Sequence, residues 1–316
     1  MVGRGVPAEP MMTSRLSRYG SSRGFALPPG SGFQTSIFHG RSGRRARLFK
    51  ANFFSMKIQI LGIHFRKDGP QLPDQLLEAG LVVVPSGPGL ANDLIESPAY
   101  REALRNADWV IPDSGLMVLA WNALHFWRPE RHIQRYSGLR LLREVLPRED
   151  VRSPAASFWI MPSLEDRDRN VQWLISNGHH ALTEEDCYLA PVYRPDEHGR
   201  VEDPNILALI EERRPKVIFV NVGGGVQEQL GWYLRSKLSY RPAILCTGAA
   251  IAFLSGGQAS IPSWADRYLL GWMMRILSDP NRYGARYGKA LRLIPALLRY
   301  RDRCPVAVNT RQARDS

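Results

Sequence analysis

Residues 107–121 read ADWVIPDSGLMVLAW, and this stretch joins a buried strand to an apolar helix through a short turn. Val110 and Ile111 are typical of a strand in a parallel sheet, and a helix is expected to begin near Leu116. Asp113 lies between them, where side chains line the ligand crevice of open α/β sheets. Asp113 is therefore a candidate general base, and the alternative is that it caps the helix that follows.

The same alternation of short apolar runs and helical segments continues from Met56 onward. Strands are predicted within residues 81–87, 109–113, 157–162, 216–222 and 242–248. Helices are predicted within residues 91–106, 115–126, 167–178 and 204–214, and from about 226. Strands separated by helices indicate βαβ units. The sequence therefore predicts an α/β fold with a doubly wound, mostly parallel, Rossmann-like sheet and a helical C-terminal appendage.

Charge is distributed unevenly along the 316 residues, which carry a net charge of +12. Residues 1–55 contain nine Lys and Arg against one acid, Glu9, and supply +8 of that total. They are rich in Gly, Ser, Pro and Arg and show no hydrophobic periodicity, so we interpret them as a disordered basic leader. Met56 opens a strand-like run and is the expected natural start. The other residues hold only +4, which argues against a nucleic-acid partner.

Cysteine and histidine give no sign of a metal site. Cys187, Cys246 and Cys304 are widely separated, and the seven His show no ligand spacing. The sequence therefore predicts no metal and no disulfide framework, which fits a reducing cytoplasm. No run of about 18 apolar residues is present, so no membrane-spanning segment is predicted.

A second candidate site is the glycine-rich stretch NVGGGVQEQLGWYL, residues 221–234. Gly223, Gly224 and Gly225 let the backbone approach a ligand closely, and the N-terminus of the following helix favours an anion such as a diphosphate. Gln227 and Glu228 lie in the first turn of that helix. The spacing matches neither the dinucleotide fingerprint nor a phosphate loop. The alternative is a tight turn between a strand and a helix.

The C-terminal part has a different character. After a small-residue turn at Gly248, aromatic and apolar residues recur every four positions at Trp264, Tyr268, Trp272 and Ile276, and basic residues are interleaved with them. Such an amphipathic segment suits a lipid headgroup region. The alternative is a helix that packs its aromatic side chains on the core.

Four segments in this order resemble the WecG/TagA/CpsF glycosyltransferases, glycosyltransferase family 26. They are AYREALRNADWVIPDSGLMVLAW (99–121), RYSGLRLLREVL (135–146), VNVGGGVQEQL (220–230) and the stretch from Gly248 through Arg286. These bacterial enzymes transfer a sugar from a UDP-sugar to a polyprenyl-diphosphate-linked saccharide in cell-surface polysaccharide synthesis. The resemblance implies a glycosyltransferase domain over residues 56–258 and a membrane-associating appendage over 259–316.

The resemblance also assigns residues. It implies that Asp113 is the catalytic base of an inverting reaction and that Arg275, Arg282 and Arg286 bind the diphosphate. Residues expected to contact the substrate are Ser86, Gly223, Gly224, Gly225, Gln227, Glu228 and Gly248. No metal and no cofactor besides the UDP-sugar donor are implied, because arginines can neutralise the diphosphate. The expected location is the cytoplasmic face of the plasma membrane, against an anionic lipid surface. Association into a homo-oligomer is left open.

Several positions depart from the family pattern. Val84-Pro85-Ser86 replaces its usual Thr-Pro-Asn, and Gly225, Ala252 and Gly271 replace a proline, an aspartate and a glutamate. Two other functions stay open, the first because of these altered positions and the second because of the turn at Gly223–Gly225. One is a catalytically silent nucleotide-sugar-binding protein of the same fold, and the other is a different α/β nucleotide-dependent transferase, such as a methyltransferase.

Overall fold

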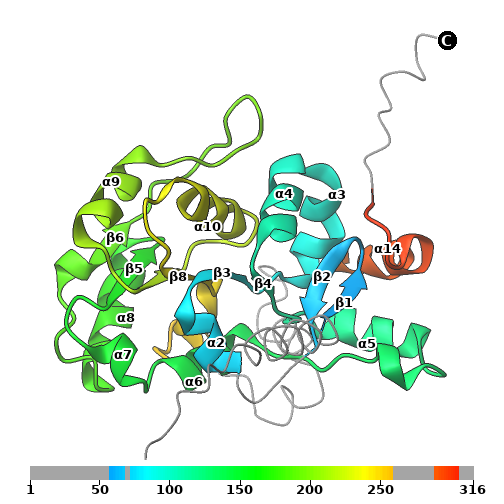
Figure 1. Ribbon diagram of the computed structural model, residues 1–316, viewed down its shortest axis with the longest axis horizontal. Coiled ribbons are helices and arrows are strands. Elements are labelled where there is room, and N and C mark those ends of the chain that lie inside the picture. Colours follow the sequence, from blue (N-terminus) through cyan, green and yellow to red (C-terminus); the bar gives the residue numbers. More distant parts are fainter. Residues whose placement is uncertain (1–56, 68–71, 259–287, 306–316) are drawn as a thin grey trace, which may run out of the picture. The chain divides into compact units, whose positions relative to one another are not determined.

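Eight strands form one sheet in the order β1-β2-β4-β3-β8-β7-β5-β6 in the computed structural model, which describes residues 57–67, 72–258 and 288–305 (Figure 1). The strands are β1 (Lys57–Ile60), β2 (Ile63–Arg66), β3 (Gly80–Val83), β4 (Trp109–Val110), β5 (Ser157–Met161), β6 (Cys187–Leu189), β7 (Val217–Val220) and β8 (Ala243–Cys246). Every neighbouring pair is parallel except β1 and β2. The predicted α/β fold with a mostly parallel sheet is confirmed. The leader and the segment holding Arg275, Arg282 and Arg286 lie outside the described residues.

Helices cover both faces of the sheet. One face carries α4 (Pro98–Asn106), α9 (Pro204–Arg213) and α10 (Val226–Lys237); the other carries α2 (Leu72–Glu78), α6 (Gly138–Val145), α7 (Glu149–Arg152) and α8 (Leu164–Ser176) (Figure 1). Alternate residues of one strand serve the two layers. Ile244 and Cys246 of β8 lie in the core under α10, whereas Ala243 and Leu245 lie in the core under α6. Strands buried on both faces explain the continuous apolar runs of the sequence.

The strand-like run at the start of the folded part forms a hairpin rather than one strand. β1 and β2 are joined by Leu61 and Gly62, which have positive φ angles of 51° and 75°. The N–H groups of Leu61 and Gly62 donate to the carbonyl oxygens of Arg301 and Asp302, at 2.7 and 2.9 Å. A Cβ at position 62 would lie 2.5 Å from the Cβ of Cys304, so only glycine fits. The turn therefore holds residues 301 and 302, near the end of the described chain, against residues 61 and 62, near its beginning.

The helix predicted over 91–106 is broken into three pieces. They are the π-helical turn η1 (Gly89–Asp93), the short α3 (Leu94–Glu96) and α4. The break falls at Ser97, whose φ of −104° and ψ of 110° are extended, because the residue before a proline avoids the helical region. The Ser97 hydroxyl then accepts from the Tyr100 N–H and caps α4. η1 follows the loop after β3 and forms part of the site.

The centre of the sheet contains the crevice that this topology predicts. β3 and β8 are neighbours, although they lie far apart in the sequence. The chain leaves β3 toward α4 on one face, and it leaves β8 into the 3₁₀ helix η4 (Gly248–Phe253), which packs with α6 and α8 on the other. Connections that diverge from adjacent parallel strands open a crevice at their carboxyl ends.

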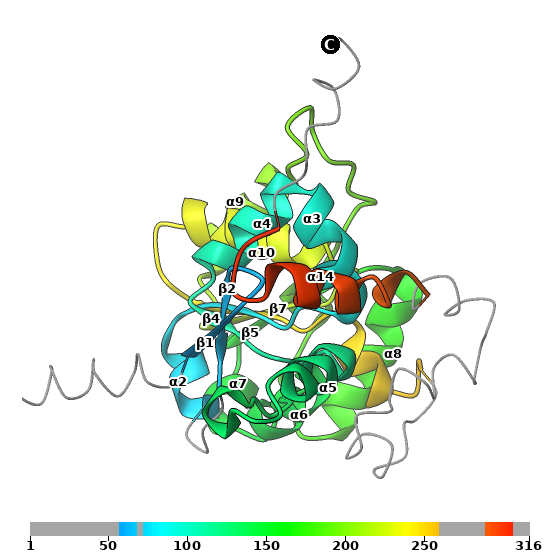
Figure 2. The same cartoon turned by 90° about the vertical axis from the view of Figure 1, so that its right-hand side faces the viewer.

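The last helix, α14 (Leu293–Tyr300), is part of the main body. Leu293, Ala296 and Leu297 are buried in the core that includes α4 and α10. α14 lies beside α5 (Gly115–Leu124), as Figure 2 shows. Within the described ranges, every helix is too short or too polar to cross a membrane.

Candidate functional site

Asp113 lies directly beyond β4 and reaches across to the start of another helix. Its Oδ1 accepts a hydrogen bond from the backbone N–H of Gly138, the first residue of α6, at 3.2 Å. The same oxygen lies 3.4 Å from Nη2 of Arg135, and the Nε of Arg135 donates to the Asp113 carbonyl oxygen at 2.6 Å. Among the described residues, none donates to Oδ2. The side chain is 28% exposed, so part of it is accessible from outside the protein.

The capping alternative for Asp113 is wrong. The cap of α5 is Ser114, whose hydroxyl accepts from the Met117 N–H at 3.2 Å. Because the helix that follows Asp113 is already capped, the carboxylate is not needed there. The structure instead holds Asp113 through the next helix, α6, and the loop that precedes it.

The loop after β3 brings Ser86 to the same edge of the sheet. A Cβ at Gly87 would lie 3.0 Å from the Ser114 hydroxyl and 3.9 Å from the Cβ of Ala290. This loop therefore runs directly beside the Asp113–Ser114 turn and the segment that precedes α14. The Ser86 hydroxyl accepts from the N–H of Gly89 at 3.3 Å, which holds the start of η1.

A cleft of about 370 Å³ opens between this loop and the glycine-rich turn. Its lining combines polar, acidic and basic side chains with exposed backbone. The residues that line it are Ser86, Pro88, Gly89, Asn92, Asp93, Glu96, Gly223, Gly224, Lys289 and Arg292. Its volume falls at the lower end of the range for small-molecule sites, roughly 300–1,000 Å³. The cleft thus joins three predicted residues to two cations that were not predicted as site residues.

The glycine-rich turn has an unusual backbone. Gly225 has a φ of +90°, which other residues rarely adopt, and a Cβ there would lie 3.1 Å from Oδ2 of Asp93. The Gly225 N–H donates to the Glu228 carboxylate at 2.7 Å, and the Gln227 N–H donates to the Gly223 carbonyl at 3.1 Å. Two N–H groups of this helix start are therefore already satisfied within the turn.

Glu228 is fully buried beneath that turn. Desolvation raises the pKa of its carboxyl to about 7. The Tyr100 hydroxyl is also buried and finds no hydrogen-bond partner within the described residues, and burial raises its pKa well above the usual value. Glu228 thus supports the turn from inside the protein rather than facing the cleft.

Gln227 connects the turn after β7 with the turn after β8. Its Nε2 donates to Oε1 of Glu228 at 3.0 Å, and a Cβ at Gly248 would lie 3.1 Å from Gln227 Oε1. That oxygen is buried and accepts no hydrogen bond from any described residue. An unsatisfied buried acceptor costs about 1–3 kcal/mol, so this is a place where a donor from water or a ligand would be favourable.

The comparisons with known proteins agree with this architecture. A model of the family described as "Glycosyl transferase WecG/TagA/CpsF family" matches residues 58–305. The chain belongs to this family. It is therefore a glycosyltransferase, and the resemblance inferred from the four sequence segments is confirmed.

Two relatives carry the same name, N-acetylglucosaminyldiphosphoundecaprenol N-acetyl-beta-D-mannosaminyltransferase. The protein from Bacillus spizizenii is 24% identical over 213 residues, which cover 65% of this chain and 74% of the relative. The protein from Staphylococcus aureus is 22% identical over 214 residues, with the same two coverages. The identity is low, in line with the altered motif positions.

The structure arranges the predicted site residues in two layers. Ser86, Gly223 and Gly224 line the cleft, with Asp113 at the neighbouring strand end, while Gln227, Glu228 and Gly248 lie behind the turn. Sequence reasoning missed Lys289 and Arg292 as site residues, although they continue the basic series of the C-terminal part. It also gave no role to Arg135, whose contact with Asp113 joins residues far apart in the chain.

Proposed function

We propose that this glycosyltransferase moves a sugar from a UDP-sugar to a saccharide linked to a polyprenyl diphosphate, with inversion at the anomeric carbon. The observation that carries the proposal is Asp113, a partly exposed carboxylate at the strand end beside the cleft. It is held through Oδ1, and no described residue donates to its Oδ2. The names of the two relatives support the lipid-linked acceptor and cell-envelope polysaccharide synthesis.

The reaction follows from that geometry. An acceptor hydroxyl loses its proton to Oδ2 of Asp113 as its oxygen attacks the anomeric carbon, a general-base role. The bond from that carbon to the diphosphate oxygen breaks, and UDP leaves with the electron pair. A single displacement of this kind inverts the anomeric centre. Arg135 and the Gly138 N–H keep the carboxylate oriented while it holds the proton.

The diphosphate is assigned to the cleft beside Ser86. Lys289 and Arg292 supply cations there, in the same lining as the exposed backbone of Gly223 and Gly224. Asp93 and Glu96 also line the cleft, but neither cation forms an ion pair with a described residue, so both are available to a phosphate. Cations that contact phosphate oxygens stabilise a leaving UDP in the way a metal ion does in other enzymes, and arginine does so with two parallel hydrogen bonds. We therefore propose a reaction without a metal, in which Arg275, Arg282 and Arg286 add to the same charge.

The lipid part of the acceptor requires docking to a membrane, for which α5 and α14 present a suitable surface. We define this membrane face by its exposed apolar side chains, Leu119, Phe126, Trp127, Leu291, Ile294 and Leu298. α14 is apolar on its buried side, and on its outer side it exposes Ile294 and Leu298 one helical turn apart, with Leu291 just before the helix. Exposed basic residues nearby, Arg128 directly after Trp127 and Arg299 on α14, match an anionic lipid surface.

The decisive test is transfer itself. The full-length protein is incubated with UDP-N-acetylglucosamine or UDP-N-acetylmannosamine and a polyprenyl-diphosphate-linked N-acetylglucosamine, and the lipid product is measured by mass spectrometry. We expect an extended lipid saccharide and released UDP, both lost in Asp113→Asn. Absence of transfer combined with UDP binding would favour the silent binding protein. Thermal stabilisation by S-adenosylmethionine and not by UDP would favour the methyltransferase.

The membrane face has its own test. Co-flotation with vesicles that contain phosphatidylglycerol is compared for the wild type and for Phe126→Ser/Trp127→Ser. These side chains are 64% and 88% exposed, so the substitution does not disturb the core. We expect the variant to remain with the soluble fraction while its UDP affinity is unchanged. Equal flotation of both proteins would place the membrane contact elsewhere.

A further inference from the structure

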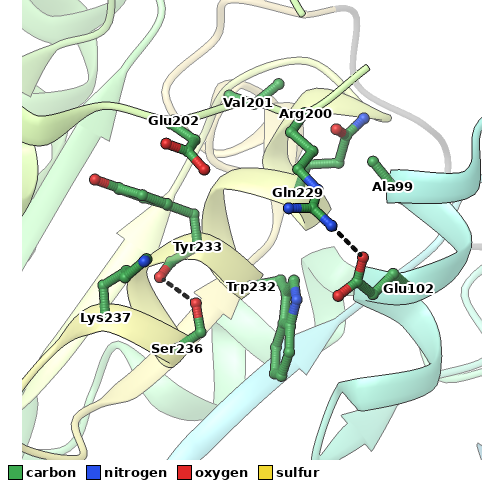
Figure 3. Close-up of a pocket in the computed structure, with 10 residues that line it drawn as sticks. All are labelled: Ala99, Glu102, Arg200, Val201, Glu202, Gln229, Trp232, Tyr233, Ser236 and Lys237. Carbon is green, nitrogen blue, oxygen red and sulfur yellow. Dashed lines mark hydrogen bonds and ion pairs between the residues drawn. The ribbon is translucent and has the colours of Figure 1, made fainter. Parts of the chain in front are cut away.

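A second cleft, of about 290 Å³, lies on the face of the sheet that carries α4 and α10 (Figure 3). It is bounded by α4, by α10 and by the chain just before α9. The residues that line it are Ala99, Glu102, Arg200, Val201, Glu202, Gln229, Trp232, Tyr233, Ser236 and Lys237. None of them lines the cleft beside Ser86. The proposed transfer reaction uses no residue of this second cleft.

The wall formed by residues 200–202 is held in place by the protein itself. The buried carboxylate of Asp203 accepts hydrogen bonds from the hydroxyls of Tyr188 and Tyr193, at 2.9 and 2.8 Å, and it also caps α9. Arg200 reaches across the cleft to Glu102 on α4, with 3.6 Å between the guanidinium and the carboxylate (Figure 3). The cleft therefore exists before any ligand binds, which lowers the entropic cost of binding.

The lining offers an apolar surface together with unused hydrogen-bonding groups. Trp232 and Tyr233 are adjacent on α10, and neither the indole N–H nor the phenol hydroxyl has a hydrogen-bond partner among the described residues. Gln229 donates through Nε2 to the Gly225 carbonyl at 3.1 Å, whereas its buried Oε1 has no partner in the described part of the chain. Aromatic side chains with a few fixed polar groups are typical of sites for small organic ligands.

The charges at the cleft indicate which ligand fits. Arg200 is already paired with Glu102 at 3.6 Å, and Glu202 offsets the charge of Lys237, so this lining holds no excess charge and its arginine is engaged by a carboxylate. A sugar ring offers an apolar C–H face for the half-buried indole of Trp232 and a rim of hydroxyls for the amide, carboxylate and guanidinium groups. Tyr233 is only 8% exposed and forms the floor of the cleft. The volume suits one or two pyranose rings. We propose that this cleft is a second saccharide-binding site, which takes a neutral sugar unit away from the transfer site.

The second cleft lies close to the transfer site, so a saccharide bound there would stay near the proposed reaction. Gln229 lies one helical turn beyond Gly225, the residue whose backbone shapes the glycine-rich turn, and Gly223 and Gly224 of that turn line the first cleft. A neutral part of a glycan held here stays close to the enzyme without occupying the donor site. The inference concerns binding alone and stands whether or not the proposed donor and acceptor are right.

The test uses the full-length protein without UDP. Binding of N-acetylglucosamine and N,N′-diacetylchitobiose is measured by saturation-transfer NMR and isothermal titration for the wild type, Trp232→Ala and Arg200→Ala. We expect binding by the wild type and affinities about tenfold weaker in both variants, equivalent to the loss of one aromatic or polar contact. Arg200 is 55% exposed, so its substitution keeps the fold even if Trp232→Ala does not. Leu164→Ala, which removes a 53% exposed apolar side chain outside both clefts and the membrane face, is the control and should bind as the wild type does.

UDP affinity separates this site from the transfer site. In Arg200→Ala we expect it to stay within twofold of the wild type. The proposal is overturned if the wild type binds neither saccharide, or if both variants bind them normally. It is also overturned if Arg200→Ala loses UDP and saccharide together, because the cleft would then belong to the donor site.

Discussion

Asp113 and Glu228 are both acids that follow a buried strand, yet the protein treats them in opposite ways. Asp113 follows β4 closely and keeps more than a quarter of its side chain exposed, and within the described part of the chain only one of its carboxylate oxygens makes a contact. Glu228 comes after the β7 turn, is fully buried and uses both oxygens, one for Gly225 and one for Gln227. A carboxylate that must accept a proton from a substrate needs an accessible oxygen. The comparison therefore supports Asp113 as the proton acceptor and Glu228 as the residue that holds the glycine-rich turn in place.

The largest expected effect is that of Asp113→Asn. The amide keeps the size of the side chain but cannot take a proton, so turnover should fall by about 10²- to 10⁴-fold. The melting temperature and the UDP affinity should stay near those of the wild type, because Ser114 and not Asp113 caps α5. Steady-state kinetics and a thermal shift with UDP measure the two properties separately. Near-normal turnover of Asp113→Asn would show that Asp113 is not the general base, so the proposed difference in role between the two acids would be wrong.

A second effect concerns the cations of the cleft. Lys289→Ala/Arg292→Ala removes two positive charges, each of which contributes roughly 1.4 kcal/mol when an exposed side chain contacts a phosphate. We expect UDP to bind about 100-fold more weakly, with the protein still folded, since both side chains are exposed. Arg299→Ala is the matched control, because Arg299 lies on the same helix outside the cleft. Equal UDP affinity in the double variant and the control would move the diphosphate out of this cleft.

The role assigned to Glu228 predicts how stability depends on pH. Its pKa is about 7 when folded and near 4.5 when unfolded, so the folded state holds the extra proton between these values. Its contribution to the free energy of unfolding therefore falls as pH rises from about 4.5 to 7, by on the order of 3 kcal/mol. Glu228→Gln lacks this titration but keeps an oxygen for the Gly225 N–H. The free energy of unfolding of the variant minus that of the wild type should therefore be more positive at pH 8 than at pH 4.5.

Chemical denaturation at several pH values measures this difference directly. Glu184→Gln, on an exposed 3₁₀ turn, controls for the loss of one negative charge. If the difference between Glu228→Gln and the wild type does not change with pH, Glu228 titrates normally. The contrast with Asp113 would then rest on accessibility alone.

The sheet could be predicted from the sequence, because buried parallel strands produce apolar runs that are visible in a single chain. The break of the 91–106 segment was less visible, although Ser97-Pro98 carries the signal for it. The hairpin at Leu61 and Gly62 was missed because its turn is fixed by contacts with residues near 302. Contacts between distant parts of the chain leave no periodic pattern in the sequence.

The same limit applies to the candidate site. Asp113, Ser86 and the glycine-rich turn follow strands, so their location at one edge of the sheet could be inferred. The sequence could not show that Ser114 would take the capping role or that Glu228 would face inward, because both depend on which side chain reaches which backbone group. Lys289 and Arg292 join the cleft only because α14 packs beside η1 and α5.

The smallest expected effect is that of Ser114→Ala, which tests the other half of the comparison. Removing the N-cap hydroxyl of α5 leaves the Met117 N–H without its partner and should cost about 1 kcal/mol. For a domain of this size that corresponds to a decrease in melting temperature of roughly 2–4 °C. Turnover at a temperature well below the transition should stay within a few-fold of the wild type, since Asp113 keeps its contacts with Arg135 and Gly138. A loss of turnover as large as that of Asp113→Asn would mean that the cap also fixes the carboxylate, so that stability and chemistry at this strand end are not separable.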